Sequence, residues 1–132
     1  MARIIVITSG KGGVGKTTAA AAIGAGLAAA GKKTVLVDMD LGLRNLDVSL
    51  GLETLVFYHI GDVLRDIVSA EEAMVTDERY PNLFLLPAAQ TVKPGTLNEE
   101  ALRRVTEELS AMADFVLIDC PAGIGEIFRM II

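Results

Sequence analysis

The sequence RIIVITSGKGGVGKTT, residues 3–18, contains the main clue to the architecture of this 132-residue chain. Its first part, residues 3–8, is a run of β-branched residues without polar alternation, which is typical of a strand covered on both faces. The run stops in a glycine-rich turn, and a long alanine-rich segment follows at once. A buried strand, a glycine-rich loop and a helix in this order predict the opening unit of a parallel α/β sheet.

The glycine-rich turn, Gly10–Thr17, fits the pattern G-x-x-x-x-G-K-[ST] of a phosphate-binding loop (P-loop). Glycines let successive backbone N–H groups converge on phosphate oxygens, and the helix N-terminus adds its positive dipole. In such a loop, Lys16 spans the β- and γ-phosphates, the Thr17 hydroxyl binds Mg²⁺, and Thr18 supports the α-phosphate. The predicted nucleotide-contacting residues of the loop are Gly10, Lys11, Gly12, Gly13, Val14, Gly15, Lys16, Thr17 and Thr18.

Strand and helix patterns alternate along the remaining chain. Apolar runs predict strands at 34–38, 82–86 and 115–119, and helical periodicity predicts helices at 16–30, 60–68, 69–75 and 99–112. Asn98 is the expected N-cap of the last of these helices, and Ser69 with Glu72 forms a capping-box pattern. The predicted class is therefore α/β, a three-layer fold in which helices flank a parallel sheet and the chemistry lies at the carboxyl ends of the strands.

Three aspartates follow the apolar strands. Asp119 ends the last strand, a position from which a carboxylate holds Mg²⁺ through water in phosphate-loop enzymes, although a helix-capping role is the alternative. Asp38 and Asp40 are two residues apart, so an extended chain points them the same way and one of them is a candidate to orient the attacking water. A turn-forming role is the alternative for both, because Leu41-Gly42 follows.

Three further residues have side chains with functional chemistry. Lys11 is an additional cation inside the loop, and spacing alone leaves open whether it is solvated or reaches a phosphate across a dimer interface. Cys120 is expected to be a small buried residue rather than a nucleophile. His59 has no partner that spacing reveals, and without a His/Cys cluster zinc is not predicted.

The composition indicates a single globular domain over residues 1–132, because 52% of the residues are hydrophobic and 22% are charged. A net charge of −5 argues against a broad nucleic-acid surface. Residues 17–31 form the longest uncharged stretch, which is shorter than a membrane span needs, and no export signal is visible. With one cysteine there is no internal disulfide, so a cytoplasmic location is expected.

Three motifs together resemble the deviant Walker A ATPases, a family of P-loop NTPases that includes division-site regulators. They are Lys11–Thr18, Asp38-Met-Asp40 followed by Leu41–Asp47, and Asp119–Gly123, and the agreement runs from Met1 to about Gly125. The resemblance implies a three-layer P-loop NTPase fold, an ATPase activity, and ATP with Mg²⁺ as cofactors. It also implies that ATP drives face-to-face homodimer formation and that hydrolysis restores the monomer during septum placement.

The family assigns roles to residues that spacing leaves open. Lys11 resembles the signature lysine that contacts the nucleotide of the opposite subunit, and it is a catalytic candidate together with Lys16 and Asp40. Asp40 resembles the aspartate that positions water, and Asn45 lies in the same first switch as a nucleotide-binding candidate. Asp119–Gly123 resembles Walker B with the second switch, so Thr17 and Asp119 are the expected Mg²⁺ ligands.

The chain departs from the family in length. Members are much longer, and their later half supplies further strands, adenine contacts and an amphipathic membrane helix, so an incomplete N-terminal portion with its first strand at a sheet edge is expected. Regulatory protein partners and peripheral inner-membrane association are therefore expectations for full-length relatives, and direct membrane binding by this chain is not expected. The alternatives are a chromosome- or plasmid-partition ATPase, which the Leu43–Asp47 stretch and acidic balance disfavour, and a nucleotide-binding module without turnover.

Overall fold

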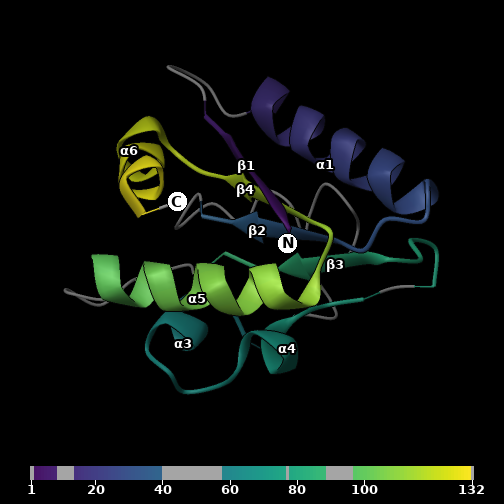
Figure 1. Cartoon of the computed structure of the whole chain (residues 1–132). Helices are drawn as coiled ribbons and strands as arrows, with labels where there is room; N and C mark the ends of the chain where they lie inside the picture. Colours follow the sequence, from purple (N-terminus) through teal and green to yellow (C-terminus); the bar gives the residue numbers. More distant parts are fainter. Residues whose placement is uncertain (1, 9–13, 40–57, 77, 89–96, 132) are drawn as a thin grey trace.

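The computed structural model of the chain describes residues 2–8, 14–39, 58–76, 78–88 and 97–131, with the side chains of 14–18 and 122 outside the described part. Strands and helices alternate along these residues, as the labels in Figure 1 show. The elements in chain order are β1 (Arg3–Ile7), α1 (Val14–Ala29), β2 (Thr34–Asp38), α3 (Ile60–Leu64), α4 (Ala70–Ala73), β3 (Leu83–Leu86), α5 (Glu99–Met112), β4 (Phe115–Asp119) and α6 (Ala122–Ile131).

The strands form one parallel sheet in the order β1-β4-β2-β3. Helix α1 lies on one side of the sheet, whereas α5 and α6 lie on the other, and the short helices α3 and α4 lie against α5 (Figure 1). The predicted three-layer α/β architecture is confirmed. Within the sheet that the described residues form, β1 is an edge strand, as expected.

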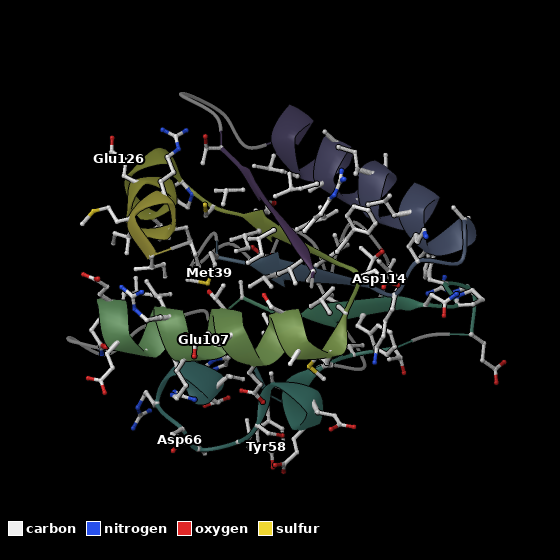
Figure 2. All side chains as sticks on the ribbon, viewed as in Figure 1. Met39, Tyr58, Asp66, Glu107, Asp114 and Glu126 are labelled. Atoms are coloured by element: carbon white, nitrogen blue, oxygen red, sulfur yellow. The ribbon has the colours of Figure 1, made fainter. Side chains whose placement is uncertain are left out.

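Each face of the sheet has its own apolar core. The α1 side is built from small helix residues over strand leucines, and the α5 and α6 side is built from larger aliphatic residues. The first cluster contains Ala20, Ala21, Ala28, Leu36, Leu85 and Leu117, and the second contains Val35, Val37, Met39, Leu102, Val105, Leu109, Val116, Ile118 and Phe128. Figure 2 shows Met39 directed toward the layer between the sheet and α5. Because both faces are covered, the strands are continuous apolar runs.

Most predicted elements are confirmed, with boundaries that differ by a residue or two. Asn98 caps α5 through its side-chain oxygen, which accepts a hydrogen bond of 2.8 Å from Ala101 N. Gly31 follows α1 with φ +85°, the left-handed conformation that glycine commonly adopts just after a helix. Beyond the predicted helices, Ala122–Ile131 forms α6.

The predicted helices at 60–68 and 69–75 are wrong in extent. Helix α3 stops at Leu64, because Asp66 adopts a left-handed φ of 60° that a continuing helix does not allow. Helix α4 ends at Ala73, because Val75 pairs with Leu85 in an antiparallel bridge. The Ser69 capping box is present with both of its hydrogen bonds. Across the described ranges, none of the helices combines the length and apolar character that crossing a membrane requires.

Candidate functional site

Three neighbouring strands end at the same level of the sheet. Asp119 at the end of β4 is in register with Ile7 of β1 on one side and with Asp38 of β2 on the other. The residues after these strands are tied to the neighbouring strand, because Cys120 N donates to Ile7 O at 3.1 Å and Met39 N donates to Asp119 O at 2.8 Å. The carboxyl edge of the sheet is therefore a rigid platform at the place where parallel α/β folds bind ligands.

The two strand-end aspartates face α1. Side chains alternate along a strand, and Leu36 and Leu117 both pack in the core cluster under α1. Asp38 and Asp119 come two residues later in their strands, so they point to the same face, and both are fully buried. A buried carboxylate is costly without a cation or hydrogen-bond donors facing it, so donors or a cation on the α1 side of the sheet stabilise this pair.

The start of α1 provides positive electrostatic potential on that side. The helix begins at Val14, and it packs on the face of the sheet where Leu36 and Leu117 lie. Its first backbone N–H groups have no carbonyl partner within the helix, and the helix dipole is positive here. Helix N-termini of this kind bind phosphate groups.

Apart from Asp38 and Asp119, the predicted site residues fall into two groups. Val14, Gly15, Lys16, Thr17 and Thr18 form the first turns of α1, with side chains outside the described part. Residues Gly10, Lys11, Gly12, Gly13, Asp40 and Asn45 lie outside the described residues altogether. The described structure brings together Asp38 and Asp119 as in-register neighbours, and α1 packs on the strand that ends at Asp119.

The donor set at this edge suits a magnesium nucleotide. Mg²⁺ is usually held by one or two carboxylates together with phosphate oxygens and water, rather than by a cage of protein ligands. The ranges that the structure describes contain no group of three or more His, Cys, Asp or Glu residues that could hold a metal ion. Asp38 and Asp119 supply hard carboxylate oxygens, so the residues present fit Mg²⁺ bound together with a nucleotide.

Two other candidate residues have roles in packing and helix capping. Cys120 is fully buried, which confirms its predicted place as a small core residue. His59 is the N-cap of α3, where its backbone N–H donates to Asp62 Oδ2 at 3.1 Å and its Nε2 lies 3.5 Å from the same oxygen. The signal that spacing analysis missed is the acid three residues after His59, because its side chain accepts a hydrogen bond from the N-cap backbone.

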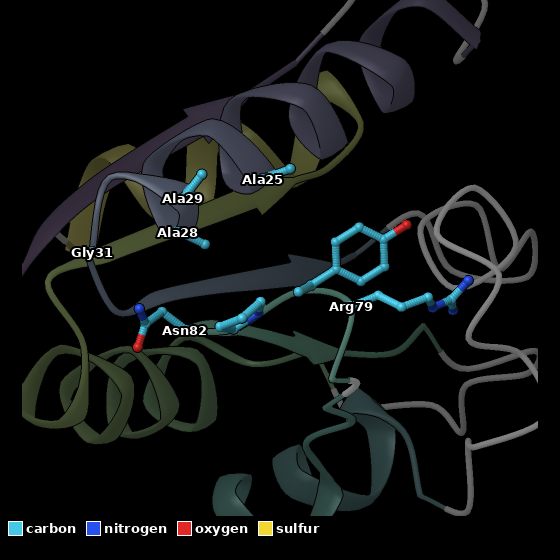
Figure 3. A pocket seen from close by; sticks show the side chains of 8 residues that line it. Ala25, Ala28, Ala29, Gly31, Arg79 and Asn82 are labelled. Atoms are coloured by element: carbon cyan, nitrogen blue, oxygen red, sulfur yellow. The ribbon is translucent and has the colours of Figure 1, made fainter.

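A separate hollow of about 210 Å³ lies at the other end of α1 (Figure 3). It is lined by residues near Gly31 and by the turn 79–82, where the Arg79 guanidinium stands 5.3 Å from the centroid of the Tyr80 ring. Because it adjoins the C-terminal end of α1, it is distinct from the edge where Val14 begins the helix.

Comparison with known proteins identifies the family to which these features correspond. A family model described as an AAA domain matches residues 2–132. The septum site-determining protein MinD of Synechocystis sp. is 54% identical over 98% of this chain and 48% of its own length. The MinD protein of Escherichia coli is 50% identical over 94% of this chain and 46% of its own length. The chain thus spans about half the length of the curated relatives it matches.

Solved structures agree with this likeness. The MinC:MinD cell division protein complex of Aquifex aeolicus matches with a TM-score of 0.82 and 47% identity, over 99% of this chain and 52% of that one. The septum site-determining protein MinD complexed with Mg-ADP, from Pyrococcus horikoshii, matches with a TM-score of 0.77 and 38% identity, over 93% of this chain and 50% of that one. The second structure contains the type of ligand for which the carboxyl edge of this sheet is suited.

Proposed function

The chain belongs to the family defined by this AAA domain, and on that premise we propose that it is the phosphate-binding half of a MinD-like ATPase. In this proposal, binding and hydrolysis of Mg-ATP switch the protein between dimer and monomer during septum placement. One observation carries it: Val14–Thr17, the second half of the Gly10–Thr17 motif, begins α1, which packs on the side of the sheet toward which Asp38 and Asp119 point. The MinD relatives, one of them complexed with Mg-ADP, support the choice of nucleotide and metal.

Different residues of the loop and the strand ends would bind different parts of the Mg-nucleotide. Bound Mg-ATP supplies the phosphoryl group to be transferred and most of the charge neutralisation. The N–H groups of residues 10–15 and the start of α1 would hold the phosphates, Lys16 would neutralise the β- and γ-phosphates, and Thr18 would support the α-phosphate. Thr17 would bind Mg²⁺ through its hydroxyl, and Asp119 would hold the ion through water.

Hydrolysis and dimer formation depend on three residues outside the described ranges. Asp40 directly follows buried Met39, and it would orient the attacking water. Lys11 would reach the nucleotide of a second copy and stabilise charge there, which makes the active form a homodimer. Asn45 would contact the nucleotide from the same switch segment as Asp40. These three roles rest on the resemblance to the deviant Walker A family.

The partners proposed for the whole protein follow the division regulators. The complex of MinC with MinD in the matching structure supports a MinC-type partner, and a MinE-type activator is proposed on family grounds. The proposed location is the cytoplasm, with peripheral inner-membrane association of the full-length protein. The acidic balance and the septum-site relatives favour this function over DNA partition.

The proposal is tested by titrating Mg-ADP and Mg-ATP into the purified chain by calorimetry. We expect the parent to bind both, and Lys16→Ala to lower the affinity by about 100-fold, because it removes the main side-chain cation of the phosphate loop. Lys32→Ala is the matched control, since Lys32 is exposed beyond the other end of α1. A folded parent chain that binds neither nucleotide would contradict the proposal. Binding without turnover would instead identify a nucleotide-binding module that does not hydrolyse ATP.

A further inference from the structure

The beginning of α6 touches the end of β1 at a contact that has no room for a side chain. An ideal Cβ atom on Gly125 would lie 2.6 Å from Thr8 Cγ2, which is closer than real Cβ contacts come. The same atom would be 3.6 Å from Val6 Cγ1 and 3.7 Å from Cys120 Sγ. Gly125 therefore occupies a notch formed by the end of β1 and the residue after Asp119.

Both walls of this notch continue into the proposed nucleotide site. Thr8 is two residues before Gly10, where the phosphate-binding motif begins, and Cys120 directly follows Asp119. The backbone joins the same two segments nearby, because Cys120 N donates to Ile7 O at 3.1 Å. Gly125 N donates to Pro121 O at 2.9 Å, which ties the start of α6 to the turn after β4. A displacement of α6 at Gly125 is thus transmitted to both the loop entrance and the Asp119 turn.

The Thr8 side chain faces α6 rather than the nucleotide side of the sheet. Val6 packs against the core cluster of α5 and α6, and side chains alternate along β1, so Thr8 shares the face of Val6. The site aspartates point to the opposite face, toward α1. Thr8 and Gly125 therefore influence the phosphate site only through the backbone that they hold in place.

We infer that Gly125 is a positioning residue of the phosphate site, because its missing Cβ lets α6 rest on the Thr8 methyl group. The contact holds the entrance of the phosphate loop at a set distance from the Asp119 turn. This inference rests on the proposed function and adds to it a residue outside the phosphate-loop and switch motifs. Small displacements at such sites have large effects on binding and catalysis, because the contacts to the ligand are geometrically demanding.

The test adds a methyl group on one side of the contact and removes one from the other side. Gly125→Ala adds a methyl where the Thr8 methyl already lies, Thr8→Ser removes that methyl and keeps the hydroxyl, and the double variant combines the changes at nearly constant volume. We expect Gly125→Ala to weaken Mg-ADP binding by about tenfold and Thr8→Ser by about threefold. The double variant should bind within about twofold of the parent, because the two changes compensate.

Gly26→Ala serves as the control for adding a Cβ to a helix. Gly26 is exposed in α1, and an ideal Cβ there meets nothing within 4 Å. Alanine also has a higher helix propensity than glycine, so lower affinity of Gly125→Ala has no explanation in helix propensity. Thermal unfolding of every variant shows that affinities are measured on folded protein. If Gly125→Ala does not fold, Thr8→Ser and the double variant still report on the contact.

The outcomes separate this inference from the proposed function. If the parent binds Mg-ADP and Gly125→Ala binds equally well, the inference is wrong and the proposed function stands. If Gly125→Ala binds weakly and Thr8→Ser does not restore the affinity, the glycine has only a general structural role. If the parent does not bind Mg-ADP, the proposed function fails and the inference fails with it. Restoration by the methyl exchange is the result that supports positioning.

Discussion

Asp38 and Asp119 are in-register neighbours at the ends of the adjacent parallel strands β2 and β4, and both are fully buried. Adjacent strands lie about 4.8 Å apart, and alternation points both carboxylates toward α1. Two acids held this close in a protein interior repel each other when both are ionised, and a facing cation or hydrogen-bond donors offset that repulsion. The pair is understandable as a site that a magnesium nucleotide and the start of α1 complete.

We predict that Asp119→Asn weakens Mg-ADP binding by about tenfold, because the neutral amide loses the charge that attracts Mg²⁺. In the presence of EDTA the variant and the parent should bind ADP alike. Calorimetry with and without Mg²⁺ measures the difference. The control is Asp114→Asn before the other end of the same strand, where the exposed carboxylate accepts a hydrogen bond of 2.9 Å from Lys33 N. Equal losses of affinity in both variants would show that Asp119 does not contribute to the Mg²⁺ site.

Local sequence signals predicted the elements of this site but not their arrangement. The apolar runs before Asp38 and Asp119 identified two buried strands, and the motif at Gly10–Thr17 identified the ligand class. That the two strands are adjacent depends on how α1 and α5 pack on the two faces of the sheet. Strand order is a non-local property, because it results from the packing of segments that are far apart in the chain.

What the sequence did not predict has physical causes that include contacts between different elements. Residues 60–68 have a helical composition, but Asp66 adopts a left-handed conformation and Arg104 binds the carbonyl groups at the end of α3. Nothing in the sequence indicated that Glu108 of α5 bonds α4, where its Oε1 accepts a hydrogen bond of 3.1 Å from Ala70 N. Both partners come from another element, so the periodicity of α5 contains no signal for them.

If Lys11 acts in dimer formation, its replacement should affect the dimer fraction much more than the affinity for nucleotide. Lys11→Ala should abolish the ATP-dependent gain in mass, because the cation that reaches the second nucleotide is lost. Affinity for Mg-ADP should change by less than about threefold, since Lys16 still neutralises the phosphates within one subunit. Light scattering and calorimetry on the same samples compare the two. Equal dimer fractions for the parent and Lys11→Ala would mean that Lys11 is solvated and does not contact the nucleotide of the second subunit.

We expect two adjacent arginines of α5 to contribute differently to the free energy of unfolding. Arg104 Nη2 donates to Val63 O and Leu64 O, each at 3.1 Å, at the negative end of the α3 dipole. Its ion pair with Asp66 at 3.6 Å adds little, because Asp66 lies on the outer surface below α5 (Figure 2) and its side chain is 83% exposed. We expect Arg104→Ala to lower the free energy of unfolding by about 1–2 kcal/mol.

Arg103 provides the matched control for that prediction. Its guanidinium pairs with Glu99 at 2.9 Å, but both side chains are about half exposed and contact the same helix. Such a pair contributes about 0.3–0.5 kcal/mol, so Arg103→Ala should have a much smaller effect on stability. Urea unfolding monitored by circular dichroism measures both variants. Similar losses for Arg103→Ala and Arg104→Ala would show that the carbonyl hydrogen bonds do not matter.

The close packing of α1 on the sheet predicts opposite effects at two glycines of the same helix. An ideal Cβ on Gly24 would lie 2.6 Å from Leu36 Cδ2, whereas one on Gly26 meets nothing within 4 Å. Leu36 is fully buried in the middle of β2, so it has no room to move away without disturbing the core. Overpacking of this kind costs about 1–3 kcal/mol, and the better helix propensity of alanine offsets about 1 kcal/mol.

We therefore expect Gly24→Ala to lower the free energy of unfolding by about 1 kcal/mol and Gly26→Ala to raise it by up to about 1 kcal/mol. Replacing Leu36 by valine in the Gly24→Ala background shortens the opposing side chain, so the two substitutions should cost less together than the sum of their separate costs. Urea unfolding of the four variants and the parent measures this coupling. Additive costs would mean that α1 moves away from β2 as a rigid body, in which case the small residues of α1 do not determine its distance from the sheet.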